Sequence, residues 1–170
     1  MNPARAALTV AAVAVALVLQ VSVFPHVAWE GVVPNLVLLV VVATGLVRGA
    51  QPAMLLGFVA GVLLDLAPPA DHVAGRWALA LVVVGYVAGR VRQDVRPTVG
   101  SVVATVAASS FVGTSVFALT GIVLRDPALG VGEVLQVIAI GVLWDVVLTP
   151  FVLPVVMGAF RRLEPARATA

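Results

Sequence analysis

The chain has 170 residues, of which 62% are hydrophobic and 11% are charged. A soluble domain carries about 25% charged residues, so most of this surface is expected to face an apolar medium such as a lipid bilayer. The absence of cysteine excludes disulfides, zinc–thiolate sites and cysteine nucleophiles. The net charge is only +2, and its ten arginines are scattered between apolar runs, which indicates membrane topology rather than nucleic-acid binding.

Six apolar runs, separated by turn signals, predict transmembrane helices. A helix needs about 17 to 25 mostly apolar residues to cross a hydrocarbon core of about 30 Å. Pro34 and Pro52 open the second and third runs, which fits the first turn of a helix because no N–H is needed there. The sequence therefore predicts one all-α transmembrane domain over residues 1–170, with helices at 6–24, 32–47, 52–66, 77–91, 99–124 and 134–160.

The distribution of arginine predicts the orientation of these helices. With a cytoplasmic N-terminus, eight of the ten arginines fall on the cytoplasmic side, and only Arg76 and Arg125 fall outside. This agrees with the positive-inside rule. A five-helix alternative places Arg161 and Arg162 outside and fits less well. We therefore expect six helices with both termini in the cytoplasm, joined by loops too short to form a separate catalytic domain.

Asp65, at the outer end of the third predicted helix, has two interpretations. Gly57, Gly61 and Asp65 are spaced four residues apart, so they lie on one face of a helix. Glycines on such a face let a neighbouring backbone come close. Arg76 opens the next helix at the same level, which predicts an Asp65–Arg76 ion pair that closes this end of the hairpin. In the alternative, Asp65 is an interfacial acid that caps a short hairpin.

Asp145 is expected to lie deeper in the membrane. It follows Glu133 by twelve residues, which is about 18 Å along a helix. A charge at the bilayer centre costs at least about 2.5–3.5 kcal/mol, so this carboxyl is protonated, paired or facing a polar cavity. A proton relay needs a second buried titratable group, and none of the first five helices supplies one at that depth. Structural or interfacial use is therefore favoured.

Small residues on the fifth predicted helix form a stripe at successive i+4 positions. Its members are Ser101, Thr105, Ser109 and Gly113. Such a stripe favours close packing within the bundle, and a partner helix is the alternative. The chain has no zinc-protease motif, nucleophile elbow or phosphate-binding loop. No catalytic residue, cofactor or metal site is therefore expected.

Segments spread over nearly the whole chain carry a resemblance to a known family. They are Gly57–Leu66, Arg76–Ala80, Gly85-Tyr86, the Pro34-Asn35-Leu36 opening of the second helix, Gly141–Trp144 and the Arg161-Arg162 pair. In spacing and residue type this set resembles the rod-shape-determining protein MreD family.

The resemblance implies a non-enzymatic subunit of the bacterial cell-elongation machinery in the cytoplasmic membrane. Such a subunit binds MreC and, through it, supports lateral-wall peptidoglycan synthases and MreB. The implied fold is similar to the substrate-binding subunits of ECF transporters, so the alternative function is a vitamin-binding transporter subunit. The candidate structural or partner-contact residues are Asp65, Arg76, Gly57, Gly61, Pro34, Asn35 and Asp145.

Overall fold

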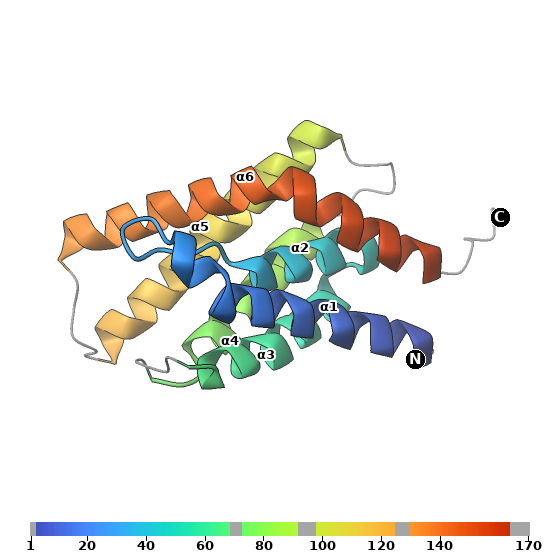
Figure 1. Ribbon diagram of the computed structural model, residues 1–170, viewed down its shortest axis with the longest axis horizontal. Coiled ribbons are helices and arrows are strands. Elements are labelled where there is room, and N and C mark those ends of the chain that lie inside the picture. The colour runs from blue at the N-terminus through green and yellow to red at the C-terminus, as the bar shows by residue number, and fades with distance from the viewer. Residues whose placement is uncertain (1–2, 69–72, 92–97, 125–129, 164–170) are drawn as a thin grey trace.

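The structure, a computed structural model, describes residues 3–68, 73–91, 98–124 and 130–163 (Figure 1). These residues form six α-helices and one short 3-10 helix, which confirms the predicted all-helical fold. The elements are α1 (Pro3–Ser22), η1 (Phe24–Val27), α2 (Leu36–Arg48), α3 (Ala50–Leu66), α4 (Arg76–Arg90), α5 (Val99–Val123) and α6 (Val131–Leu163).

Three of the helices are long and apolar enough to cross a membrane by themselves. They are α1, α5 and most of α6, from Gly132 to Leu163. The apolar helices α2 and α3 are shorter, with 13 and 17 residues, and α4 has 15 residues. The prediction of six crossings is therefore supported directly by three helices and stays a prediction for the other three.

Helix α2 lies at the centre of the bundle (Figure 1). It packs against α1, α3, α4, α5 and α6, and every residue from Leu36 to Leu46 is buried. A helix that is hydrophobic all round belongs in a protein interior. The other helices therefore form a shell around α2, and apolar side chains such as Leu55 and Phe151 are exposed on their outer faces.

Helices α3 and α4 form a closely packed hairpin because each contributes glycines to the contact. A Cβ atom on Gly57 would overlap the backbone of α4, and one on Gly61 would lie 2.6 Å from the nitrogen of Ala78. In the other direction, a Cβ atom on Gly85 would lie 2.6 Å from the carbonyl oxygen of Ala53. The absence of side chains at these positions lets the two backbones approach closely.

The small-residue stripe of α5 faces the interior of the bundle. Thr105, Ser109 and Gly113 are buried, and a Cβ atom on Gly113 would lie 2.8 Å from a methyl group of Val84 on α4. This confirms the prediction that the stripe packs within the bundle.

The predicted start of the second helix is wrong by four residues. The prediction was 32–47, whereas α2 begins at Leu36. Val32 instead closes a tight turn with Trp29, in which each backbone N–H donates to the other residue's carbonyl at 3.1 and 2.8 Å. Gly31 at the tip has a φ of 74°, a conformation that glycine adopts at little cost. The other predicted boundaries lie within three residues of the observed ones.

Pro34 is consequently not in the first turn of a helix, which corrects the sequence-based interpretation. It precedes Asn35, the N-cap of α2, whose side-chain oxygen accepts a hydrogen bond from the Leu38 N–H at 2.9 Å. An N-cap asparagine has a non-helical backbone. Pro34 therefore lies before the helix, which begins at Leu36. Pro52, by contrast, is the third residue of α3 and lies in its first turn as predicted.

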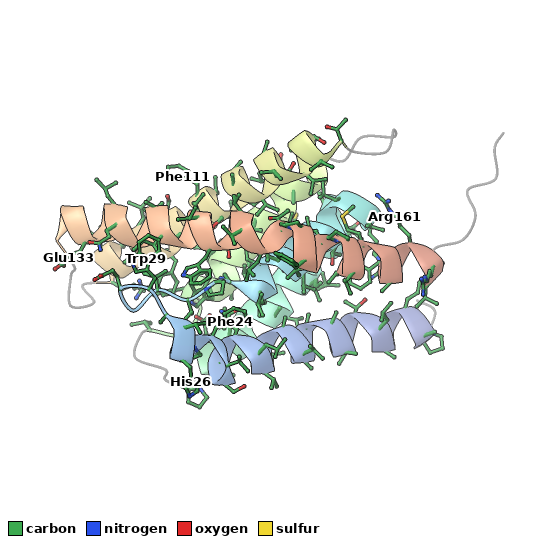
Figure 2. The ribbon with its side chains drawn as sticks, turned by 45° about the horizontal axis from the view of Figure 1, so that its top comes forward. Phe24, His26, Trp29, Phe111, Glu133 and Arg161 are labelled. Carbon is green, nitrogen blue, oxygen red and sulfur yellow. The ribbon has the colours of Figure 1, made fainter. Side chains whose placement is uncertain are left out.

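The ends of the bundle differ in charge. The Arg5 guanidinium donates through Nε to the Leu163 carbonyl at 2.7 Å, so α1 begins at the same end of the molecule where α6 finishes (Figure 1). Arg161 lies toward this end, and Glu133 and Trp29 lie toward the opposite end (Figure 2). The basic residues of the described chain therefore gather mainly at the end that holds the start of α1.

Candidate functional site

Asp145 projects from α6 to the start of the central helix. Its side chain is only 1% exposed. One carboxylate oxygen accepts a hydrogen bond from the Asn35 backbone N–H at 2.8 Å, and the other accepts one from the Ser110 hydroxyl of α5 at 2.7 Å. This carboxylate therefore joins α2, α5 and α6 at one point inside the bundle.

Two further side-chain oxygens complete the polar cluster at the start of α2. The Asn35 side chain caps its own helix, and Gln20 of α1 accepts a hydrogen bond from the Val37 N–H at 3.2 Å. The first N–H groups of a helix have no partner within that helix, and its N-terminus carries partial positive charge. The side-chain oxygens of the cluster accept hydrogen bonds from these N–H groups, and Asp145, when ionised, also interacts favourably with the partial positive charge.

Three buried polar atoms, on residues that belong to this cluster or are next to it in sequence, have no hydrogen-bond partner among the described residues. They are the Nδ2 of Asn35, the hydroxyl oxygen of Ser109 and the Nε1 of Trp144, each on or next to a residue of the cluster. Buried polar groups are normally bonded to protein or to ordered water. Asn35 Nδ2, on the N-cap residue of α2, is therefore a buried donor of the cluster that is not used within the described residues.

Asp65 is the second buried acid, with a side chain that is 2% exposed. Its carboxylate accepts hydrogen bonds from the backbone N–H groups of Gly75, Trp77 and Ala78, at 2.8, 3.0 and 3.1 Å. These groups belong to the start of α4, so the carboxylate of one helix caps the next. Gly61 lies one turn earlier, and its close contact with α4 brings Asp65 within reach of this start.

Arg76 lies at the same end of the hairpin and is 7% exposed. Its guanidinium donates to the Phe117 carbonyl of α5 through Nε at 3.2 Å and Nη2 at 2.9 Å. It also lies 3.9 Å from the centre of the Phe117 ring, a cation–π geometry. A Cβ atom on Gly121 would overlap this guanidinium, so that glycine leaves space for it. The Asp65–Arg76 ion pair itself stays a prediction.

Arginines also fasten the basic end of the bundle. Arg48, at the end of α2, donates to the Thr9 hydroxyl of α1 at 2.8 Å. Its guanidinium lies 4.4 Å from the centre of the Phe160 ring of α6. Together with the bond from Arg5 to α6, these contacts tie α1, α2 and α6 to one another.

The structure thus distributes the predicted site residues over two places. Asp65, Arg76, Gly57 and Gly61 lie on the α3–α4 hairpin, whereas Asn35 and Asp145 meet at the start of α2, next to Pro34. The sequence interpretation missed Gln20 and Ser110. A lone amide in the apolar run of the first helix was the available signal for Gln20, because polar side chains inside membrane helices usually face protein. In the described part of the chain, no group of three His, Asp or Glu side chains suits a metal ion.

These observations define a helical membrane protein, because apolar side chains such as Leu55 and Phe151 cover its outer faces. Its buried polar groups form hydrogen bonds that hold its own helices together. Residues 4–157 match the model of a family described as rod shape-determining protein MreD. The chain belongs to the MreD family, as its sequence resemblance implied, and this is not a known enzyme family. No curated protein and no solved structure matches the chain.

Proposed function

We propose that this protein is a non-enzymatic membrane subunit of the bacterial cell-elongation machinery. In this role it binds an MreC-like membrane protein and, through that partner, supports MreB and the synthases of lateral-wall peptidoglycan. The observation that carries the proposal is the family match, which extends over nearly the whole chain.

The way the buried acids are used supports a scaffold rather than a catalyst. The hydrogen bonds described above for Asp65 and Asp145 run to backbone N–H groups and to Ser110, which are parts of the fold itself. A general acid or base must instead reach a substrate atom. Acids committed to helix starts stabilise the bundle, and a stable bundle with apolar outer faces suits a subunit that positions membrane partners.

The proposed arrangement is six transmembrane helices with both termini in the cytoplasm. Arg5 and Arg161 lie toward one end of the bundle, and Glu133 lies toward the other. Cytoplasmic loops of membrane proteins are enriched in arginine and lysine. This distribution supports a cytoplasmic location for the end at which α1 begins.

Co-purification tests the proposed partner. The tagged chain is expressed together with the MreC-like protein of its own organism, extracted in mild detergent and purified through the tag. We expect the MreC-like protein to be retained, whereas an unrelated tagged membrane protein of similar size retains none. Loss of the MreC-like protein from a preparation that is still folded would overturn the proposal.

The unused Asn35 donor at the start of α2 favours one alternative, a small-molecule-binding subunit of an ECF-type transporter. Asn35 Nδ2 is a buried donor of the kind that orients a ligand. Calorimetry with vitamins distinguishes the two functions. Saturable binding of a vitamin, together with no recovery of the MreC-like protein, would reverse their order.

A further inference from the structure

The α3–α4 hairpin is much shorter than the helices beside it. At 1.5 Å per residue, α3 and α4 are about 25 and 22 Å long, whereas α5 and α6 are about 37 and 50 Å. The hydrocarbon core of a bilayer is about 30 Å thick. Tilting lets a long helix fit such a core, but it only shortens the reach of a short one.

Polar groups mark both ends of the hairpin. At one end, Asp65 caps the start of α4, and Arg76 is held by the Phe117 carbonyl. Phe117 lies six residues before the end of α5, so α5 continues for about 9 Å beyond this level. At the other end, Arg90 is exposed and donates to the Tyr86 hydroxyl at 3.2 Å.

The hairpin is also a rigid unit. Its glycine contacts fix α3 against α4 backbone to backbone, so neither helix can slide along the other to gain length. Gly49 has a φ of 93°, which favours glycine, and is the residue at which α2 ends and α3 begins. The short span is therefore built into the fold.

The outer face of the hairpin is covered by apolar side chains that have no protein over them. On α3, Leu55, Phe58, Leu63 and Leu66 are between 45% and 67% exposed. Within one helix they cover only twelve residues, about 17 Å from the first Cα to the last. This apolar band is the surface that acyl chains would contact.

We propose that the exposed face of the α3–α4 hairpin is a lipid-contact surface of reduced height, which thins the bilayer beside it. The acyl chains next to it must shorten or tilt, because otherwise the polar ends of the hairpin would be drawn into hydrocarbon. The longer helices α5 and α6 can meet a thicker bilayer and have no such effect. The protein therefore favours bilayers with short acyl chains, a property that rests on the proposed six-helix crossing.

Cysteine labelling tests this proposal, because the chain contains no cysteine of its own. Val73 lies just before α4 and is 48% exposed, and Leu124 at the end of α5 is 50% exposed. Val73→Cys and Leu124→Cys are therefore matched variants for a short and a long helix. Each is reconstituted in phosphatidylcholine vesicles with acyl chains of about 14, 18 or 22 carbons, and its reaction with a membrane-impermeant maleimide is followed, together with the thermal unfolding midpoint.

We expect Val73→Cys to react as fast as Leu124→Cys with 14- and 18-carbon lipids, and the unfolding midpoint to be highest in the shortest lipid. Loss of Val73→Cys labelling already at 18 carbons, while Leu124→Cys still reacts, would overturn the thinning but leave the six crossings intact. A midpoint that is independent of lipid length would also overturn it. Failure of Val73→Cys to react in any lipid would show that the hairpin does not cross, and would instead remove the six-helix topology.

Discussion

Asp65 and Asp145 use their carboxylates in the same way, although one lies at the end of a helix and the other within one. Each accepts hydrogen bonds from backbone N–H groups at the start of a neighbouring helix. A helix start has up to four N–H groups without a partner, and a start that is buried in the protein, as beside Asp65 and Asp145, has no bulk water to bind them. The two acids therefore replace water at the starts of α4 and α2.

Replacing Asp145 with alanine is expected to lower the free energy of unfolding by about 1–3 kcal/mol. The substitution leaves the Asn35 N–H and the Ser110 hydroxyl without a buried partner. Equilibrium unfolding in detergent micelles measures the effect. An Asp145→Ala protein as stable as the wild type would contradict the capping role.

Ser110→Ala is the matched control for this experiment. It removes one hydrogen bond to the same carboxylate and is expected to cost about 0.5–1.5 kcal/mol. Because the two groups bond to each other, the double variant should lose less than the sum of the two single losses. Additive losses would mean that the Ser110 bond contributes nothing to the stability of the cluster.

The predicted ion pair between Asp65 and Arg76 can be tested separately from the capping bonds. Asp65→Asn keeps an oxygen that can accept from the start of α4, but it removes the negative charge. Arg76→Ala removes the positive charge along with the bonds to Phe117. Those bonds do not involve Asp65, so they cancel in a double-mutant cycle.

If the pair forms, the double variant Asp65→Asn with Arg76→Ala should be more stable than the sum of the single effects implies. The coupling should exceed the range of about 0–1 kcal/mol that is typical of exposed pairs, because both side chains are buried. Thermal and chemical unfolding of the four proteins supply the cycle. Strict additivity would refute the ion pair.

At the level of helices, the α3–α4 hairpin is the element that the sequence predicts best. The i+4 spacing of Gly57, Gly61 and Asp65 puts them on one face, and the structure has α4 packed along that face. This works because spacing along a helix determines direction without any knowledge of the rest of the fold. The partner glycines of α4, at 85 and 89, follow the same spacing.

Gly61→Ala is expected to destabilise the protein by at least about 1–3 kcal/mol, the usual cost of overpacking. The new methyl group would lie 2.6 Å from the Ala78 nitrogen, and a backbone cannot move aside as a flexible side chain can. Gly158→Ala in α6 is the matched control, because its Cβ atom meets nothing within 4 Å. That change should be neutral or stabilising, since alanine favours helix over glycine. Equal effects of both substitutions on the unfolding free energy would contradict the close packing of α3 and α4.

The first residue of α2 is a feature that hydropathy in the sequence does not predict correctly. Val32 and Val33 extend the apolar run without interruption, so hydropathy alone assigns them to the helix. The turn between Trp29 and Val32 and the cap at Asn35 decide otherwise. Gln20 and Ser110 escape prediction for a related reason, because their partners are far apart along the chain, by 17 and 35 residues, and only the packing of the helices brings them together.

For the whole molecule, the central position of α2 connects the polar cluster to the membrane. A buried helix of 13 residues is shorter than a hydrocarbon core of about 30 Å, so its start lies inside the bundle and must be capped by protein. Asp145 and Gln20 reach that start from α6 and α1, and this is why a membrane-embedded helix tolerates an acid and an amide as neighbours. The apolar run from Leu36 to Ala43 agrees with this central place, because a helix that is hydrophobic all round is normally buried.

Both termini are expected on the cytoplasmic side of the membrane. Six crossings return the chain to the side where it started, and Arg5 and Leu163 are in hydrogen-bond contact at one end of the bundle. Reporter fusions at Ala170 and in the loop at Asp71 and His72, positions outside the described residues, measure the topology directly. The two fusions should report opposite sides of the membrane, with Ala170 in the cytoplasm, because the arginine-rich ends of membrane helices stay inside. A periplasmic signal from the Ala170 fusion would require an odd number of crossings or a reversed orientation, and the six-helix topology with cytoplasmic termini would then be wrong.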